Sequence, residues 1–378
     1  MLRVPLEKPC PDFDDLEKVI KGERESKRVH LVELTVDPEI MEYIIRNYLH
    51  GTMDRQVMEY MQSSYARKGL NLASKDIKER CQQQRIDFYW RMGYDSIKVN
   101  AEYTNLPDFK ERIAPDTALL SRSNRAWVEE KEGIINSWDD FERIDWNSIQ
   151  PDLTLLHLAR KNLPRGMKIL VGTPLFEIVL ERFLGYENLF VLSHDEPQLV
   201  ESIFEQWGKK VHEFYEKTVK FSEVGGIFHT DDLGYKTGTM MNPDFLRKNV
   251  FPWFKRYALL SHREEKMFWL HSCGNLSKVM EDLIGYVGID ALHSFEDNSS
   301  SVMDCKRRYG DRIALLGGVD MDKLTRMSEP QFRGYVRRIL KECMPTRYAL
   351  GSGNTIANYV SVENYLTMLD EGLRWNGQ

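Results

Sequence analysis

The sequence predicts an α/β protein built as a single (β/α)8 barrel, the TIM-barrel architecture, over residues 1–378. Short apolar runs alternate with longer amphipathic segments, eight such runs can be counted, and most of them end in a polar residue or a glycine. A chain of 378 residues is long enough for one large barrel. A doubly wound open sheet is the alternative. It is disfavoured because no glycine-rich phosphate loop follows the first strand.

The first third of the chain predicts a helical extension and the first strands. A helix is expected around 13–21, ahead of a strand at 28–35 and a helix at 39–49 that Pro38 opens at its favoured first-turn position. A helical pattern over 54–91 leads to a second strand at 95–103. Residues 104–150 are charged, aromatic and proline-containing, so we expect an insertion after the second strand that forms a pocket wall.

From residue 151 the alternation becomes regular. Strands are expected at 168–173, 225–230, 266–271, 289–295, 312–316 and 347–350. Helices are expected at 152–162, 175–190, 195–222, 243–260, 276–287, 300–309, 329–343 and 362–374. With the two earlier strands, this gives the strand count of a closed barrel.

Composition excludes several classes of protein. The net charge is -6 and acids are interspersed with bases, which argues against a nucleic-acid or anionic-membrane partner. No window is long and apolar enough to span a bilayer, and the first fifteen residues do not resemble a signal peptide, so a cytoplasmic protein is expected. The five cysteines have no framework spacing. This is typical of a reducing compartment and leaves Cys273 free as a ligand.

The strongest chemical signal follows the strand at 266–271. His271 and Cys273 are two residues apart, and strand side chains with that spacing point to the same side, so the pair can hold one ion. Imidazole and thiolate suit zinc. A buried cysteine beside a hydrogen-bonded core histidine is the alternative.

Other polar residues follow the remaining strands, where a barrel places its active site. The candidates for substrate binding are Glu33, Asn100, Tyr103, Asp320, Ser352 and Asn354. Each could instead cap the helix that follows, and this alternative is strongest for Asp320 and Asn354.

A third metal ligand and an acid are expected at neighbouring strand exits. Glu296 follows the next strand and is favoured as the third ligand of a catalytic zinc over His293, which has the opposite strand parity. Asp231 and Asp232 are the catalytic candidates. Adjacent strand side chains face opposite ways, so we expect Asp232 to enter the mouth as a general acid or base or a substrate-cation anchor. The other acid would brace the loop, and two solvated loop acids are the alternative.

Several motifs together resemble a known family. They are Asp231-Asp232-Leu233-Gly234, Asn242-Pro243, Phe251-Pro252, His271-Ser272-Cys273-Gly274-Asn275, Tyr309-Gly310-Asp311-Arg312 and Gly317-Gly318-Val319-Asp320. In order and spacing, over about residues 130–375, they resemble the uroporphyrinogen decarboxylase superfamily. That superfamily includes zinc-dependent corrinoid-linked methyltransferases and is similar in barrel and site to cobalamin-independent methionine synthase.

Departures from the decarboxylase pattern favour the methyltransferases. Uroporphyrinogen decarboxylases carry arginines near the N-terminus for the substrate carboxylates, whereas this chain has Glu33 at the first strand exit. The methyltransferases bind zinc through a His-x-Cys, which His271 and Cys273 match, and a further cysteine, where this chain has Ser352. Glu296 is similar in placement to the glutamate ligand of methionine synthase.

The resemblance therefore implies zinc-dependent methyl transfer, linked to a thiol or to a corrinoid carried on a partner protein, with a small-molecule substrate. Dimers are common in this family, and the insertion at 104–150 could serve such contact. A metal-free decarboxylase of a tetrapyrrole or smaller acid is the alternative, with Asp232 stabilising positive charge. A barrel that binds its ligand without turnover is the third hypothesis.

Overall fold

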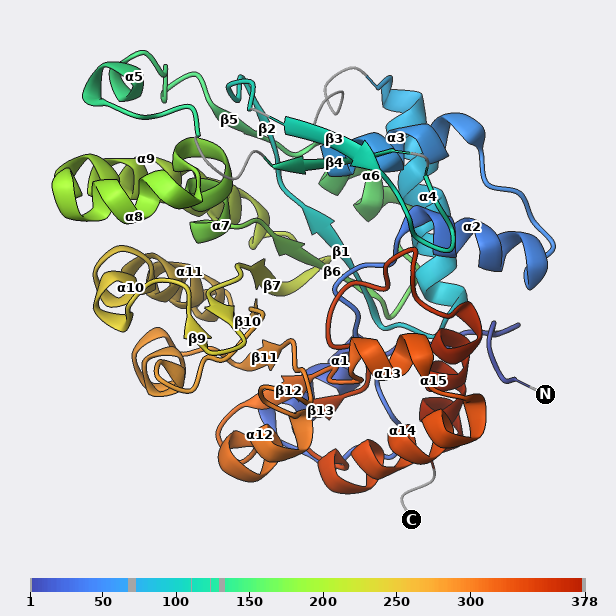
Figure 1. Ribbon diagram of the computed structural model, residues 1–378. Helices are drawn as coiled ribbons and strands as arrows, with labels where there is room; N and C mark the ends of the chain where they lie inside the picture. The colour runs from blue at the N-terminus through green and yellow to red at the C-terminus, as the bar shows by residue number, and fades with distance from the viewer. Residues whose placement is uncertain (1, 67–72, 110, 123, 129–132, 376–378) are drawn as a thin grey trace.

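A parallel sheet forms the centre of the molecule, with helices around it (Figure 1). The computed structural model describes residues 2–66, 73–109, 111–122, 124–128 and 133–375. Seven strands pair in the order β1-β6-β7-β10-β11-β12-β13. Their bounds are β1 Ser96–Asn100, β6 Lys168–Gly172, β7 Val224–Thr230, β10 Met267–His271, β11 Ala291–His293, β12 Ala314–Leu316 and β13 Tyr348–Ala349. The α/β class is confirmed, and the arrangement is that of a TIM-like barrel.

Helices connect the strands and cover the outside of the sheet, as parallel crossovers require (Figure 1). The helices of the described residues are α1 Phe13–Lys21, α2 Pro38–Asn47, α3 Arg55–Ala66, α4 Lys75–Arg91, α5 Trp138–Glu142, α6 Thr154–Asn162, α7 Phe176–Ile178, α8 Tyr186–Asp195, α9 Pro197–Thr218, α10 Pro243–Asn249, α11 Phe251–Arg263, α12 Val302–Tyr309, α13 Met321–Arg326, α14 Glu329–Cys343 and α15 Val362–Arg374. Val179–Leu184 and Asp282–Val287 are π-helical. Within the described residues, none of these helices has the length and apolar character needed to cross a membrane.

The prediction of a regular strand at 28–35 is wrong. This segment makes isolated parallel bridges, Leu31 with Leu350 and Val36 with Ile356. The Val32 amide donates to the Leu350 carbonyl and the Leu350 amide donates to the His30 carbonyl, each over 2.9 Å. The segment therefore extends the wall of the barrel beyond β13.

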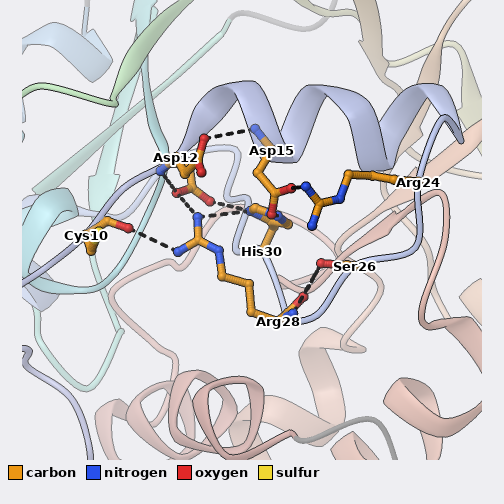
Figure 2. Close-up of polar contacts among 8 residues, drawn as sticks. Cys10, Asp12, Asp15, Arg24, Ser26, Arg28 and His30 are labelled. Carbon is orange, nitrogen blue, oxygen red and sulfur yellow. Dashed lines mark hydrogen bonds and ion pairs between the residues drawn. The ribbon is translucent and has the colours of Figure 1, made fainter.

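On its other side this segment is held by hydrogen bonds of side chains. The buried His30 ring lies between two carboxylates, with Nδ1 2.6 Å from Asp95 and Nε2 3.1 Å from Asp15 of α1. Arg28 donates to Asp95 over 2.7 Å and to the Cys10 carbonyl over 3.1 Å. Figure 2 shows Cys10, Asp15, Arg28 and His30 gathered beside α1. Polar side chains thus tie the segment to α1 and to the start of β1.

The barrel interior combines large and small side chains. Phe228 of β7 and Trp269 of β10 meet edge to face with centroids 5.7 Å apart. Alanines at 291, 314 and 349 on β11, β12 and β13 belong to the same buried cluster. Small residues facing large ones fill the space at native packing density.

Helix α1 closes the amino-terminal end of the barrel. Phe13, Leu16 and Ile20 are buried in the interior cluster, and the Phe13 ring centroid lies 6.3 Å from that of Trp269. The Phe13 amide donates to the Gly166 carbonyl just before β6, and the Arg347 amide, just before β13, donates to the Val19 carbonyl. The opposite, carboxyl end is left for the site.

The chain leaves the sheet between β1 and β6. The second strand, expected over 95–103, ends at Asn100, and β2 (Glu102–Thr104) pairs antiparallel with β5 (Gln150–Asp152). The hairpin of β3 (Glu111–Pro115) and β4 (Asn124–Val128) and then α5 lie within this excursion. Its last part packs on the body through Trp146, whose ring centroid is 5.1 Å from that of Phe183. A shorter hairpin, β8 (Gly234–Tyr235) with β9 (Gly238–Thr239), follows β7.

Candidate metal centre

Three potential ligands converge at the carboxyl ends of β7 and β10. They are Asp232, His271 and Cys273, each of which offers one ligand atom within 4.8 Å of the other two. His271 Nε2 lies 3.4 Å from Asp232 Oδ1 and 3.7 Å from Cys273 Sγ. The predicted convergence of His271 and Cys273 is therefore found, with Asp232 as the carboxylate beside them.

Strand register explains why Asp232 reaches this group. His271 pairs with Thr230 of β7, so Asp232, two residues further, comes level with Cys273. The Cys273 amide donates to Asp232 Oδ1 over 2.8 Å, which fixes the carboxylate against the loop after β10. Burial favours the neutral acid, but hydrogen bonds from His271 and Cys273 outweigh it and lower the pKa of Asp232.

The group is open on one side. His271 is 4% exposed, whereas the Asp232 side chain is 35% exposed and Cys273 is partly exposed. Gly274 has a φ of +85°, and a Cβ there would lie 2.3 Å from the Gly234 carbonyl carbon. Glycine at 274 therefore lets the β8–β9 hairpin approach the loop that carries Cys273.

His293 supports His271 from behind. His271 Nδ1 lies 2.8 Å from His293 Nδ1, and His293 is fully buried. Burial, together with the positive charges of His271 and Lys98, holds the pKa of His293 well below its usual range. A neutral His293 can accept the Nδ1 proton of His271, which leaves His271 Nε2 free to bind a metal.

Two side chains donate hydrogen bonds to the Cys273 sulfur. Asn354 Nδ2 lies 3.1 Å and Ser294 Oγ 3.4 Å from Cys273 Sγ. Ser294 has a φ of +92°, a conformation that costs a non-glycine residue energy and is typical of functional sites. Burial raises the pKa of the Cys273 thiol, so a metal ion is needed to hold it as thiolate.

Glu296, expected as the third ligand, does not belong to the group of three among the described residues. Its charge is nevertheless close enough to add to the raised pKa of Cys273. His271 pairs with His293 in the parallel ladder, so Phe295 is the residue level with Cys273 and Glu296 has the opposite parity. The carboxylate of the group comes instead from Asp232, which follows β7, the neighbour of β10 on the side opposite β11.

Asp231 braces the fold. It is fully buried and accepts the backbone amides of Leu175, Phe176 and Glu177 over 2.7–2.9 Å, at the start of α7. Its Oδ2 also lies 3.2 Å from His229 Nε2. The structure therefore gives the two aspartates the division of labour that adjacent strand positions predict, with Asp231 holding a loop and Asp232 in the mouth.

Glu33 and Ser352 form a buried pair near the mouth. Glu33 accepts the Ser352 amide over 2.9 Å, and its second oxygen lies 2.5 Å from Ser352 Oγ. Ser352 Oγ also contacts the Asn354 carbonyl. Burial raises the pKa of Glu33 to about 8. One hydroxyl proton cannot serve two acceptors, so a protonated Glu33 that donates to Ser352 satisfies this arrangement.

The remaining predicted substrate ligands lie elsewhere. Asp320 caps α13 by accepting the amides of Asp322 and Lys323 over 3.0 and 3.1 Å, which is the alternative expected from sequence. Tyr103 is buried against Trp207, with ring centroids 4.9 Å apart. Asn100 is exposed at the end of β1. None of these three is in the metal-ligand group of the described residues.

Three residues at the site carry roles that sequence reasoning missed. Ser294 had no signal, because its contact with sulfur depends on an unusual backbone angle. His293 was weighed only as a ligand, not as the hydrogen-bond partner of His271. Lys98 did have a signal, a lysine in the middle of the apolar strand Ser96–Asn100.

An apolar groove is lined in part by α7 and by the β8–β9 hairpin, two elements that also contact the loops of the candidate metal centre. It has a volume of about 630 Å³ and is lined by Phe176, Leu180, Tyr186, Phe190, Tyr235 and Met240, among others. The backbone amide of Phe176, a residue that lines the groove, donates a hydrogen bond to Asp231. The Tyr235 carbonyl accepts the Asn275 amide over 2.9 Å, so the β8–β9 hairpin joins the groove to the loop after Cys273.

The donor set fits zinc. One nitrogen, one sulfur and one oxygen suit a borderline-soft ion, and three protein ligands leave a fourth position for a reactant. Zinc–ligand bonds of about 2.0–2.3 Å in a tetrahedron give ligand–ligand distances of about 3.3–3.6 Å. The separations of 3.4 and 3.7 Å are close to these edges.

Comparisons with known proteins identify a family and a similar fold. Residues 180–374 match the family model described as uroporphyrinogen decarboxylase (URO-D). A methyltransferase from Methanosarcina mazei has a similar structure, with a TM-score of 0.66 at 15% identity, over 95% of this chain and 97% of that one. At this identity the likeness is one of fold.

A B12-independent methionine synthase from a Shewanella species gives a TM-score of 0.46 at 12% identity, over 80% of this chain and 89% of that one. This likeness is too weak to carry an argument. The comparison with curated proteins gives no match.

Proposed function

The chain belongs to the uroporphyrinogen decarboxylase family, and from this premise we propose that it catalyses zinc-dependent methyl transfer, linked to a thiol or a corrinoid, at the carboxyl-end mouth of the barrel. The observation that carries the proposal is the convergence of Asp232, His271 and Cys273 within 4.8 Å. The Methanosarcina methyltransferase supports it at the level of fold.

Each residue of the site has a role in this proposal. His271, Cys273 and Asp232 would hold the zinc ion. When bound, zinc lowers the pKa of a coordinated thiol and so supplies a nucleophile at neutral pH. The open side at Asp232 admits the reactant, while Asn354 and Ser294 stabilise negative charge on the Cys273 sulfur.

Further details belong to the proposal as well. The reactants are a small molecule and a methyl carrier, for which a corrinoid-carrying partner protein is the candidate. The apolar groove beside the β8–β9 hairpin supports a reactant with an apolar part. Glu296 remains the proposed alternative to Asp232 as third ligand, because its charge reaches Cys273.

The decarboxylase alternative calls for cations that hold several substrate carboxylates. The segment at 28–35 instead carries the acidic residue Glu33, which accepts a hydrogen bond from the Ser352 amide. Buried Arg122 is engaged by Asp37 and Glu39 over 2.7 and 3.1 Å. Glu33 and Arg122 therefore do not provide the cluster of cations that this reaction calls for.

Metal content tests the proposal. The purified chain is reconstituted with zinc, dialysed and analysed for metal, and we expect about one zinc per chain. His271→Ala and Cys273→Ala remove ligands and lose the metal, while Cys10→Ser, at an exposed cysteine, keeps it. A wild-type chain that retains no zinc would overturn the proposal.

Methyl transfer is then measured directly. Methylcobalamin with 2-mercaptoethanol is the simplest donor and acceptor pair, and its demethylation is followed by absorbance. We expect turnover that depends on zinc and disappears in Cys273→Ala. Release of carbon dioxide from uroporphyrinogen, unaffected by Cys273→Ala, would favour the decarboxylase instead.

A further inference from the structure

Lys98 points into the barrel from the middle of β1. It pairs in register with Leu170 of β6, whose side chain belongs to the interior cluster. Its neighbours Ile97 and Val99 belong to the core on the helix side. Lys98 is 8% exposed. An ammonium group thus lies inside the barrel.

Among the described residues, the structure shows no hydrogen bond or ion pair of the Lys98 ammonium. Buried Lys78, by comparison, donates to Glu102 over 2.9 Å. An unpaired buried charge costs several kcal/mol, so proteins retain one mainly where a function requires it.

The fold reserves space for this side chain. A Cβ at Gly172, the last residue of β6, would lie 2.8 Å from Lys98 Cε. Gly172 is two positions beyond Leu170, so the Lys98 side chain runs toward the carboxyl ends of the strands. Its Nζ lies over the Phe228 ring, 5.0 Å from the centroid, a cation–π contact that attracts the ammonium but supplies no hydrogen-bond acceptor.

The electric field of Lys98 reaches two buried histidines near the metal centre. Burial is the largest influence on the pKa of Lys98 and lowers it to about 7. The charge of Glu177 acts to raise this pKa, and the charge of Arg85 acts to lower it. Lys98 in turn lowers the pKa of His229 and of His293. The Phe228 ring, over which Lys98 Nζ lies, has its centroid 5.6 Å from that of His293, and His293 hydrogen-bonds to His271.

We propose that Lys98 binds the carboxylate of a monoanionic substrate inside the barrel mouth, beside the position where the metal centre reacts with it. The inference rests on the proposed function, which it deepens by naming the substrate class. A carboxylate supplies the charge and the hydrogen-bond acceptors that the ammonium lacks.

A phosphate dianion fits less well. It needs more than one cation or a free helix N-terminus. The amides at the start of α7, which carries Glu177, are already occupied by Asp231. Glu177 also adds negative charge on that side.

Binding of simple anions tests the proposal. The zinc-reconstituted full chain is titrated with acetate, benzoate and inorganic phosphate at constant ionic strength, and heat is recorded. We expect saturable binding of a carboxylate, weaker binding of phosphate, and a loss of about tenfold or more in carboxylate affinity in Lys98→Met. Lys168→Met, at a lysine that donates to the Ser222 carbonyl at the other end of the barrel, is the matched control and keeps the affinity.

A second measurement needs no variant. Reductive methylation of the wild-type lysines, read by mass spectrometry, is expected to slow at Lys98 when benzoate is bound and not at Lys168. Lack of carboxylate binding by the wild type, tighter binding of phosphate, equal binding by Lys98→Met, or lack of protection would each overturn the proposal.

Zinc content separates the proposed carboxylate site from the proposed methyl transfer. A Lys98→Met chain that keeps zinc but loses carboxylate affinity supports both, whereas a wild type that binds carboxylate but no zinc would refute the methyltransferase alone.

Discussion

Asn354 Nδ2 donates a hydrogen bond of 3.1 Å to Cys273 Sγ and so joins the loop after β13 to the loop after β10. The methyltransferases that the chain resembles carry a further cysteine at the place of Ser352. Here Ser352 is bonded to Glu33, and the side chain two residues later meets the sulfur instead. The loop after the last strand thus contributes a hydrogen-bond donor to the Cys273 sulfur.

Asn354→Ala is expected to weaken zinc binding about tenfold, because partners behind metal ligands typically contribute that much. Affinity is measured by competition with a chromogenic chelator at fixed pH. The matched control is Asn162→Ala, which removes a side-chain amide that donates to the Leu158 carbonyl within α6. Unchanged affinity in Asn354→Ala would show that its contact with sulfur has no energetic role.

A pair of isosteric variants identifies the third ligand. Asp232→Asn is expected to lower zinc affinity by at least about tenfold, because a neutral amide replaces a charged ligand. Glu296→Gln is expected to change affinity by less than about threefold, since Glu296 lies outside the group of three. The opposite order would restore Glu296 as the ligand predicted from sequence.

The buried Glu33 makes stability depend on pH. Its folded-state pKa of about 8 lies above the ordinary value of 4.5, so the folded chain holds a proton that the unfolded chain releases. This contribution to the free energy of unfolding is complete below pH 4.5 and is lost as the pH rises toward 8. The loss is about 5 kcal/mol at most.

Glu33→Gln mimics the protonated acid and removes this dependence. Chemical denaturation of both chains from pH 5 to 8.5 is the measurement. We expect similar stability near pH 5 and a more stable variant near pH 8. Parallel curves for the two chains would mean that Glu33 is ionised in the folded protein.

Phe13 of α1 is expected to matter for stability alone. Phe13→Ala leaves a cavity against Trp269 at the closed end of the barrel and is expected to cost ~3–5 kcal/mol. Phe190→Ala, at a side chain that is 51% exposed, is the control and is expected to cost less than about 1 kcal/mol. Zinc content of the folded fraction is expected to be unchanged in both.

Much of the fold could be predicted from periodicity, because each buried strand of a parallel sheet is a short apolar run. The segment at 28–35 has that pattern yet forms only bridges, since the carboxylates of Asp15 and Asp95 hold His30 through its side chain. Contacts of that kind come from residues distant in sequence, so local pattern cannot reveal them.

The sequence predicts the site where the spacing along one strand decides which way side chains point, as it does for His271 and Cys273. It does not predict the carboxylate, because the choice depends on register across two strand pairs. His271 pairs with both Thr230 and His293, and this places Asp232 level with Cys273 while it turns Glu296 to the opposite parity. Lys98 also escaped prediction, since a lysine in a strand usually faces solvent.

Phe13, Leu16 and Ile20 of α1 fill the amino-terminal end of the barrel. In the part of the chain that the structure describes, this leaves the carboxyl end as the opening through which the proposed methyl transfer would take both reactants. A bulky carrier protein docked there would trap whatever already lies inside. The proposed reaction would then have a compulsory binding order, with the small molecule first and the carrier second, and steady-state kinetics would show the carrier slowing release of the small molecule.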